Sequence, residues 1–351
     1  MSPVPDMTTL RRRHASLDAY AGTRLVTLED GPARGLRIIE MRSGGGLDAE
    51  IVVDRTFDIG RLAQDGETLS WHTPNGDRHP ALIDSQGDGG QGYLRGLSGF
   101  LSTCGFDHIR QPETLPARDL PLYPGDQIAY PLHGHGAQQP ARLIGHGLSE
   151  EGPTPYLWCE GEVVQSMTFR GALRLRRRIE IPLGGTELRL RDRVDNIGPH
   201  PAPSMMLYHF NLGFPLVDAD SRLVPGPAEE LWQSLPHDPR APFGPPSDSY
   251  QSEISVHRPQ GPGLATCRLI NPRRGLELSI SFDVATLPCL QLLRLRGAGY
   301  YMAGIEPCTT VHRSRQAADQ AGELPLLAPG ESRDFALDIS LARPQSILPK
   351  A

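Results

Sequence analysis

The chain has 351 residues, of which 38% are hydrophobic and 22% are charged, a composition that supports a folded core and argues against a disordered chain. Its net charge of −6 disfavours broad binding to nucleic acids or to anionic membranes, because both need a basic face. The 38 glycines and 34 prolines are about a fifth of the residues and predict many turns and few long helices.

The first part of the chain predicts one short helix followed by strands. Residues 7–20 favour a helix, with Asp6 or Thr8 near its start. The hydrophobic period then changes to two, which predicts short strands at 24–28, 35–41, 47–53, 58–62 and 67–71. Turn residues separate these segments, and strands about ten residues apart with turns between them are typical of an antiparallel sandwich.

The middle of the chain shows no clear period. Residues 72–155 contain many glycines and prolines, and a loop region of this length in a compact chain usually carries function. Its aromatic and apolar side chains indicate that it packs onto another part of the protein.

Alternating segments resume in the second half. Strands are expected at 156–162, 166–169, 172–181, 186–196, 205–209, 264–270, 276–282, 290–295, 300–306 and 332–341. Gly184 and Gly185 predict a hairpin turn, and the arginines around it are interpreted as a solvated sheet face. The proline-rich stretch 225–248 is expected to be a connection. Without repeats, heptads or βαβ units, residues 1–351 are predicted to form one all-β domain, a large and mostly antiparallel β-sandwich.

The five cysteines indicate reduced thiols. They are scattered, odd in number and include no CxxC pair, so neither a disulfide framework nor a structural zinc site is expected. The N-terminus lacks the apolar core of a signal peptide, and no stretch approaches the ~18 apolar residues of a membrane span. These features predict a cytoplasmic protein that binds neither membrane nor nucleic acid.

The glycine-rich run at 87–96 is interpreted as a structural loop. It lacks the Lys-Ser/Thr of a phosphate-binding P-loop. If it borders a substrate pocket, Arg95 is available for a hydroxyl or a carboxylate. Covalent nucleophilic catalysis is disfavoured, because the sequence contains no GxSxG motif and no cysteine in an activating context.

Two histidines in the segment LHGHG are candidate binding residues. His133 and His135 have the spacing of half a metal site, and the other half would have to come from acidic residues or from His108, His146 or His209. The pair could instead line a polar pocket or serve only the structure of the loop. The residues alone leave these alternatives open.

Two apolar strands end in a titratable side chain. His209 lies between aromatic residues before a Gly-Phe-Pro turn and is either a satisfied core histidine or a functional group. Glu306 ends the other strand, and a carboxylate there is costly to bury unless it is paired. Burial raises the pKa of a glutamate toward the range of a general base. Glu306 is therefore either a surface charge or the base of a pocket.

Five short motifs occur in an order that resembles the aldose 1-epimerase (mutarotase) superfamily. They are LSTCGFDH (101–108), LHGHG (132–136), DRVDN (192–196), LYHFN (207–211) and GIEPCT (304–309). The segments are most similar to the DUF4432 branch of mutarotase-like proteins, over about residues 20–342. The resemblance implies a galactose mutarotase-like β-supersandwich with a sugar site on its concave face.

The resemblance also implies roles for individual residues. It makes His209 the general acid, Glu306 the general base and His133 a second pocket histidine. Weaker candidates for substrate binding, chosen by donor type and position, are His108, His135, Arg55 and Arg95. The GxxGRxxNR segment of well-studied mutarotases is absent, and residues 58–61 (DIGR) only echo it.

This chemistry would interconvert the anomers of a monosaccharide or sugar derivative, with no cofactor and no metal. We expect the acid and the base to lie on opposite sides of the sugar, across a gap wide enough for a pyranose. One alternative is a metal-dependent epimerase or isomerase, if His133, His135, His209 and Glu306 converge. Another is a non-catalytic carbohydrate-binding protein. The identity of the sugar and the oligomeric state stay open.

Overall fold

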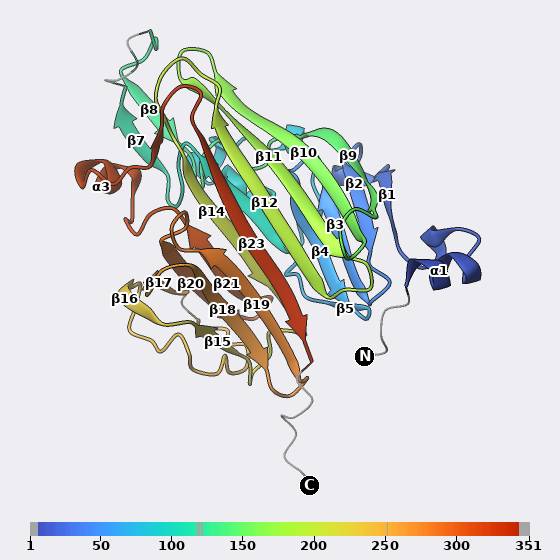
Figure 1. Cartoon of the computed structure of the whole chain (residues 1–351). Helices are drawn as coiled ribbons and strands as arrows, with labels where there is room; N and C mark the ends of the chain where they lie inside the picture. The colour runs from blue at the N-terminus through green and yellow to red at the C-terminus, as the bar shows by residue number, and fades with distance from the viewer. Residues whose placement is uncertain (1–5, 118–119, 121, 251, 344–351) are drawn as a thin grey trace.

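The computed structural model describes residues 6–117, 120, 122–250 and 252–343 (Figure 1). Most of its strands belong to three β-sheets, and the strand pairs within the sheets are antiparallel. The prediction of an all-β, mostly antiparallel fold is therefore confirmed. None of the helices in these residues is long and apolar enough to cross a membrane.

The three sheets combine neighbouring and distant segments of the chain. The five-stranded sheet contains, in order, β1 (Gly22–Thr27), β2 (Arg37–Arg42), β3 (Leu47–Val52), β4 (Asp58–Gln64) and β5 (Glu67–Thr68). The eight-stranded sheet has the order β15 (Arg222–Pro225), β18 (Leu264–Asn271), β19 (Leu276–Asp283), β23 (Ser332–Ala342), β12 (Glu187–Asn196), β11 (Gly171–Pro182), β10 (Tyr156–Met167) and β9 (Arg142–Ser149). The six-stranded sheet has the order β16 (Ala228–Gln233), β17 (Glu253–Pro259), β20 (Cys289–Gly297), β21 (Tyr300–Cys308), β14 (Met205–Leu212) and β6 (Leu101–Phe106).

The remaining elements are short. Two small sheets pair β7 (Glu113–Pro116) with β8 (Gln127–Tyr130) and β13 (Ala202–Pro203) with β22 (Leu326–Leu327). The α-helices are α1 (Met7–Arg13), α2 (Gly87–Gly90) and α3 (Arg315–Gln320), and 3-10 turns occur at Leu17–Ala19, Gly31–Ala33, Pro80–Leu82 and Gly92–Arg95. The glycine-rich run at 87–96 therefore forms two short turns, and Asp88 and Gly89 in the first of them have a positive φ.

The N-terminal helix is shorter than predicted. Asp6 begins it by accepting hydrogen bonds from the backbone and hydroxyl groups of Thr9. It ends at Arg13, because His14 has an extended backbone and Ser16 begins a separate 3-10 turn by accepting from the Asp18 N–H. The expected helix over 7–20 is thus an α-helix and a 3-10 turn.

The sequence missed several strands between residues 72 and 155 and in the proline-rich stretch. Every residue of β6 is buried, so this strand shows no alternation of polar and apolar residues. β9 and the β7–β8 hairpin also lie in the region without a clear period, and β16 lies within 225–248. The two segments expected at 156–162 and 166–169 belong largely to one strand, β10.

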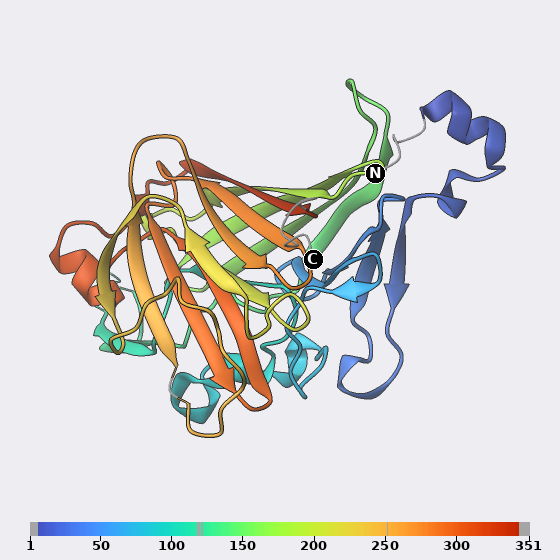
Figure 2. The same cartoon turned by 90° about the horizontal axis from the view of Figure 1, so that it is seen from below.

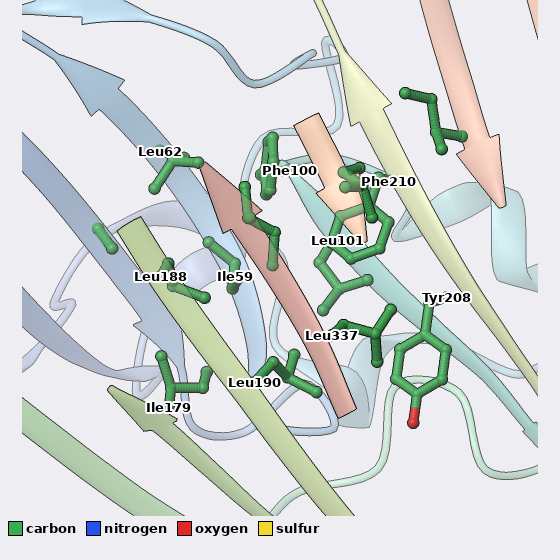
Figure 3. Packing of buried hydrophobic residues seen from close by; sticks show 14 of the residues in the cluster. Ile59, Leu62, Phe100, Leu101, Ile179, Leu188, Leu190, Tyr208, Phe210 and Leu337 are labelled. Atoms are coloured by element: carbon green, nitrogen blue, oxygen red, sulfur yellow. The ribbon is translucent and has the colours of Figure 1, made fainter. Parts of the chain in front are cut away.

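One hydrophobic core joins the three larger sheets. The inner face of the eight-stranded sheet supplies Ile179, Leu190 and Leu337, which are essentially inaccessible to solvent. The opposite layer supplies side chains from the five- and six-stranded sheets, among them Ile59 and Phe210 (Figure 3). In Figure 2 these two sheets lie side by side, opposite the eight-stranded sheet. Because the inner face of the six-stranded sheet is buried in this core, its outer face packs against the segments between β5 and β9.

A buried ion-pair network crosses this core. Arg177 donates to both carboxylate oxygens of Asp192 at 2.9 and 2.7 Å and to Asp58 at 2.9 Å. Thr103 donates its hydroxyl and backbone N–H to Asp58, and the Tyr208 hydroxyl donates to Asp192. The five side chains come from all three large sheets and are fully buried or nearly so. The network therefore fixes the sheets relative to one another.

The interpretation of the arginine run as a solvated sheet face is wrong for one of its residues, Arg177. Arg176 has 49% of its side chain exposed, and Arg174 and Arg178 about a third of theirs. Arg177 lies on the same face as Leu175 and Ile179 and is fully buried. Its position in the alternation puts it in the core, where the two carboxylates neutralise it.

Replacing Arg177 by Met should strongly destabilise the fold. The variant leaves Asp58 and Asp192 buried without a cation, which should lower the free energy of unfolding by about 3–5 kcal/mol. Urea unfolding followed by circular dichroism measures this loss. The matched control is Arg176→Met on the solvent face, expected to cost at most about 1 kcal/mol. Equal losses in the two variants would contradict the role of the network.

Candidate active site

His209 and Glu306 lie next to each other on the outer face of the six-stranded sheet. Phe210 of β14 pairs with Ile305 of β21, so the preceding and following residues, His209 and Glu306, face each other. Nε2 of His209 is 3.5 Å from Oε1 of Glu306, and the two side chains are 7% and 0% exposed. The prediction of a pyranose-wide gap between His209 and Glu306 is therefore wrong. The register of two adjacent strands places both side chains on one wall of the site.

Gln291 holds the other oxygen of Glu306. It lies directly opposite Glu306 on β20 and donates from Nε2 to Oε2 at 2.5 Å. Arg110, from the segment after β6, donates from Nε to the amide oxygen of Gln291 at 2.9 Å. Burial raises the pKa of Glu306, while His209, Gln291 and Arg110 act in the opposite direction by favouring the carboxylate. Oε1 has no hydrogen-bond partner.

His133 completes a group of aromatic rings beside this pair. Its ring centroid is 5.7 Å from that of His209, with the planes at 86°, and 4.9 Å from the ring of Tyr93. Nδ1 of His133 accepts the backbone N–H of Arg110 at 3.3 Å, so the neutral ring carries its proton on Nε2. Burial, together with the nearby His209, His108 and Arg110, holds the pKa of His133 well below its usual range.

Buried polar atoms without partners continue from this pair toward Arg55. They are Oε1 of Glu306, Nδ1 of His209, Oδ1 of Asn211, and Nε and Nη2 of Arg55. Asn211 follows His209 on the same face of β14 and donates to the backbone oxygens of Gly99 and His209. A Cβ atom on Gly99 would lie 2.9 Å from Nη2 of Arg55. Such unpaired atoms are rare in folded proteins, and several of them on neighbouring segments indicate a place for a polar ligand.

Gly304 packs directly against the pair. It precedes Glu306 by two residues and so shares its face of β21. A Cβ atom at this position would lie 2.9 Å from Oε1 of Glu306 and 3.6 Å from Cε1 of His209. A side chain at this position would therefore collide with the carboxylate, so glycine allows Glu306 and His209 to keep their positions.

Arg55 itself is 2% exposed. Its nearest carboxylate is Asp77, whose Oδ1 is 3.6 Å from Nη1. The guanidinium thus keeps two nitrogens free at the end of the series of unpaired atoms. Arg55 lies beside Gly99, whose backbone oxygen accepts a hydrogen bond from Asn211.

The other three weaker candidates have partners elsewhere. His108 is buried against Tyr130 and its Nε2 contacts the backbone oxygen of Gln111 at 2.7 Å, although its Nδ1 has no partner. Arg95 is exposed and forms a bidentate pair with Asp88 at 2.6 and 2.9 Å.

His135 uses both ring nitrogens. Nδ1 is 2.8 Å from Oδ2 of Asp107, and Nε2 is 3.0 Å from the Gln86 amide nitrogen. Burial opposes the charge on Asp107, but the hydrogen bonds from His135 and the charge of Arg170 lower the pKa of that carboxyl to about 2. His135 therefore does not converge with His133, His209 and Glu306. Within the described parts of the chain, no three His, Cys, Asp or Glu residues are arranged to hold a metal ion.

Three hollows on the described surface lie away from this cluster. One of about 480 Å³ is lined by arginines and acidic residues on the outer face of the eight-stranded sheet. Its charged groups largely pair with one another, as in Arg178 with Glu160 and Arg193 with Asp334. The unpaired polar atoms argue more strongly for the site at Glu306, which reaches solvent through His209, His133 and Gln291, at 6%, 8% and 8% exposure.

Sequence reasoning missed Gln291, Arg110 and Asn211. Gln291 is a polar residue within the apolar run Leu290–Leu293, and this exception could have pointed to it. Asn211 lies two residues after His209 in the motif LYHFN, so the two-residue period of a strand places both side chains on the same face. Arg110 offered no comparable signal, because it lies outside regular structure and its partners come from distant strands.

Comparison with protein families decides where the chain belongs. A family model described as a domain of unknown function, DUF4432, matches residues 33–341. The chain belongs to the DUF4432 family. A search of curated protein sequences gives no match.

Solved structures share the fold of this DUF4432 protein. A Klebsiella pneumoniae protein provisionally assigned as an aldose 1-epimerase has a TM-score of 0.79 at 21% identity, over 91% of this chain and 83% of its own. A galactose mutarotase-like protein from Clostridium acetobutylicum has a TM-score of 0.63 at 12% identity, over 92% and 98%. A galactose 1-epimerase from Lactobacillus acidophilus has a TM-score of 0.57 at 14% identity, over 91% and 98%. The predicted galactose mutarotase-like fold is confirmed.

The protonation state of His133 provides a test of the site. We expect ¹⁵N NMR to find the ring still neutral, with the proton on Nε2, under acidic conditions in which an exposed histidine is largely protonated. The reason is burial beside His209 and Arg110. The variant His133→Gln assigns the signals. A titration midpoint near the ordinary value of about 6.5 would contradict the described burial.

Proposed function

We propose that the protein is an aldose 1-epimerase that interconverts the anomers of a monosaccharide or sugar derivative. The observation that carries the proposal is the contact between His209 and Glu306, in which a buried carboxylate keeps one oxygen without a partner. The relation of fold to proteins described as aldose and galactose 1-epimerases supports it, although fold alone does not define an activity.

Mutarotation needs an acid and a base that reach two neighbouring oxygens. Ionised Glu306 removes the proton of the anomeric hydroxyl, and protonated His209 donates a proton to the ring oxygen. The C1–O5 bond breaks, the open aldehyde turns about C1–C2, and the reverse transfers close the ring on the other face. Both oxygens are bonded to C1, so two groups on one wall can serve them together. The reaction uses neither a redox cofactor nor a Lewis acid.

The environment of Glu306 suits a general base. Burial raises the pKa of its carboxyl toward the working range, while Gln291 and His209 keep the ionised form accessible. The bond from Gln291 occupies Oε2, so Oε1 is the oxygen that takes the proton.

The remaining unpaired groups serve the rest of the sugar. We assign Arg55 and Asn211 to sugar hydroxyls, because both present unpaired polar atoms beyond His209. His133, neutral and protonated on Nε2, contributes a hydrogen-bond donor on the same side. The cytoplasmic location remains a prediction from the sequence.

Replacing Glu306 by Gln should abolish most of the activity. The amide keeps the shape but cannot accept the proton, so kcat should fall at least about 100-fold, and His209→Asn should do likewise. NMR of anomer exchange over hexoses, pentoses, uronates and ketoses selects the substrate and measures the rate. Sugar affinity should change little in both variants.

The control is Glu323→Gln, an exposed glutamate paired with His312, which should keep full activity. Near-full exchange in Glu306→Gln would disprove the assignment. A wild type that binds sugars without exchanging their anomers would favour a carbohydrate-binding protein.

Two arginines provide a second test. Arg55→Met should lower kcat/KM about tenfold, mainly through KM, because it removes hydrogen bonds to sugar hydroxyls. Arg95→Met should leave both constants unchanged, since Arg95 pairs with Asp88 on the surface. Steady-state kinetics on the same substrate compares the two variants. A larger effect at Arg95 would reverse the assignment.

A further inference from the structure

Arg110 is a buried arginine that belongs to no helix or strand. It is 6% exposed and has a positive φ of 70°. Its guanidinium donates to Gln291, to the backbone oxygens of Thr310 and His312, and to the thiols of Cys289 and Cys308. The segment after β6 is thereby attached to β20 and β21 at the place where Glu306 lies.

These contacts determine how Gln291 is oriented. An arginine can only donate, so the amide oxygen of Gln291 must face Arg110. The NH₂ group then points to Glu306, where it donates to Oε2. A reversed amide would direct its oxygen at the carboxylate, which would favour the protonated acid. Arg110 therefore acts on Glu306 through the orientation of one amide.

The backbone of Arg110 also holds His133. The His133 N–H donates to the Arg110 oxygen at 2.9 Å, and the Arg110 N–H donates to Nδ1 of His133. His133 likewise has a positive φ, of 62°. Two buried residues with side chains, bonded to each other and both in the left-handed region, cost conformational energy that the surrounding contacts offset. Such strain is typical of functional sites.

We propose that Arg110 is a positioning residue for Glu306: through Gln291 it holds the carboxylate ionised, with Oε1 directed at the substrate. The catalytic significance rests on the proposed function, whereas the effect on the carboxylate does not. Arg110 does not contact the reacting atoms, because Gln291 lies between it and Glu306.

The direct test is ¹³C NMR titration of the Glu306 carboxyl in the protein without substrate, assigned with Glu306→Gln. In Arg110→Met the midpoint should rise by about one pH unit or more, because the carboxylate loses a nearby cation and an oriented donor. Gln291→Met should shift it in the same direction. The titratable or charged groups that face Glu306 are His209, with His133 behind it, Arg110, Cys104, Cys289 and Cys308.

The matched control is Arg294→Met. Arg294 is equally buried on β20 but donates to the backbone oxygens of Asp238 and Pro242. Its loss destabilises the protein in the same general way and should leave the Glu306 midpoint unchanged. Equal shifts in Arg110→Met and Arg294→Met would overturn the proposal, because they would indicate a general effect of destabilisation. Should Arg110→Met fail to fold, Gln291→Met carries the test, and an unchanged midpoint there overturns the proposal.

The double variant Arg110→Met/Gln291→Met separates a relayed effect from a direct one. If Arg110 acts through Gln291, the double variant should shift the midpoint by less than the sum of the two single shifts. Full additivity would overturn the relay. In an active enzyme, kcat/KM falls on the acidic side of its pH profile as Glu306 becomes protonated. In the variants this fall should move to higher pH together with the midpoint of the Glu306 titration. If no sugar is exchanged, the proposed function fails, while the titration still decides the role of Arg110.

Discussion

The ion pairs of Arg177 are the interaction on which the arrangement of the three sheets depends. One guanidinium between Asp58 and Asp192 connects the five- and eight-stranded sheets, and Thr103 and Tyr208 add the six-stranded sheet. Neighbouring residues on a strand point to opposite faces. Tyr208 on the inner face therefore determines where His209 stands on the outer face. The core and the candidate site therefore lie on opposite faces of the same strand, β14.

The buried charged groups on the inner and outer faces of the sheets differ in how many of their polar atoms have hydrogen-bond partners. Arg177 has its hydrogen bonds and its counter-charges within the core, which makes it a structural group. Glu306 is equally buried but keeps Oε1 free, and the adjacent His209 keeps Nδ1 free. A fold does not normally tolerate such atoms, since burying a polar group without a partner costs free energy. The difference is the physical reason to assign chemistry to Glu306 and structure to Arg177.

The sequence predicted what depends on local pattern and missed what depends on register. Alternation located most strands, and apolar strands ending in His209 and Glu306 drew attention to both residues. The same alternation also put Arg177 among Leu175 and Ile179, so its burial could have been predicted. The pairing of β14 with β21 could not, because neither strand contains information about its partner. For that reason the sequence predicts a gap between His209 and Glu306, whereas the structure has a contact. The contacts of Arg110 with β20 and β21 were hidden for the same reason.

The contact between acid and base also constrains how the proposed reaction would proceed. With both groups on one wall, the anomeric centre has to approach Glu306 and His209 from the same side. The aldehyde must then turn about C1–C2 while the rest of the molecule stays in place. Arg55 and Asn211, beyond His209, present the unpaired atoms that would hold the distal hydroxyls during this rotation. Because the acid and the base act on two oxygens bonded to C1 while polar groups would hold the distal end, one wall can serve both anomers without moving its catalytic groups.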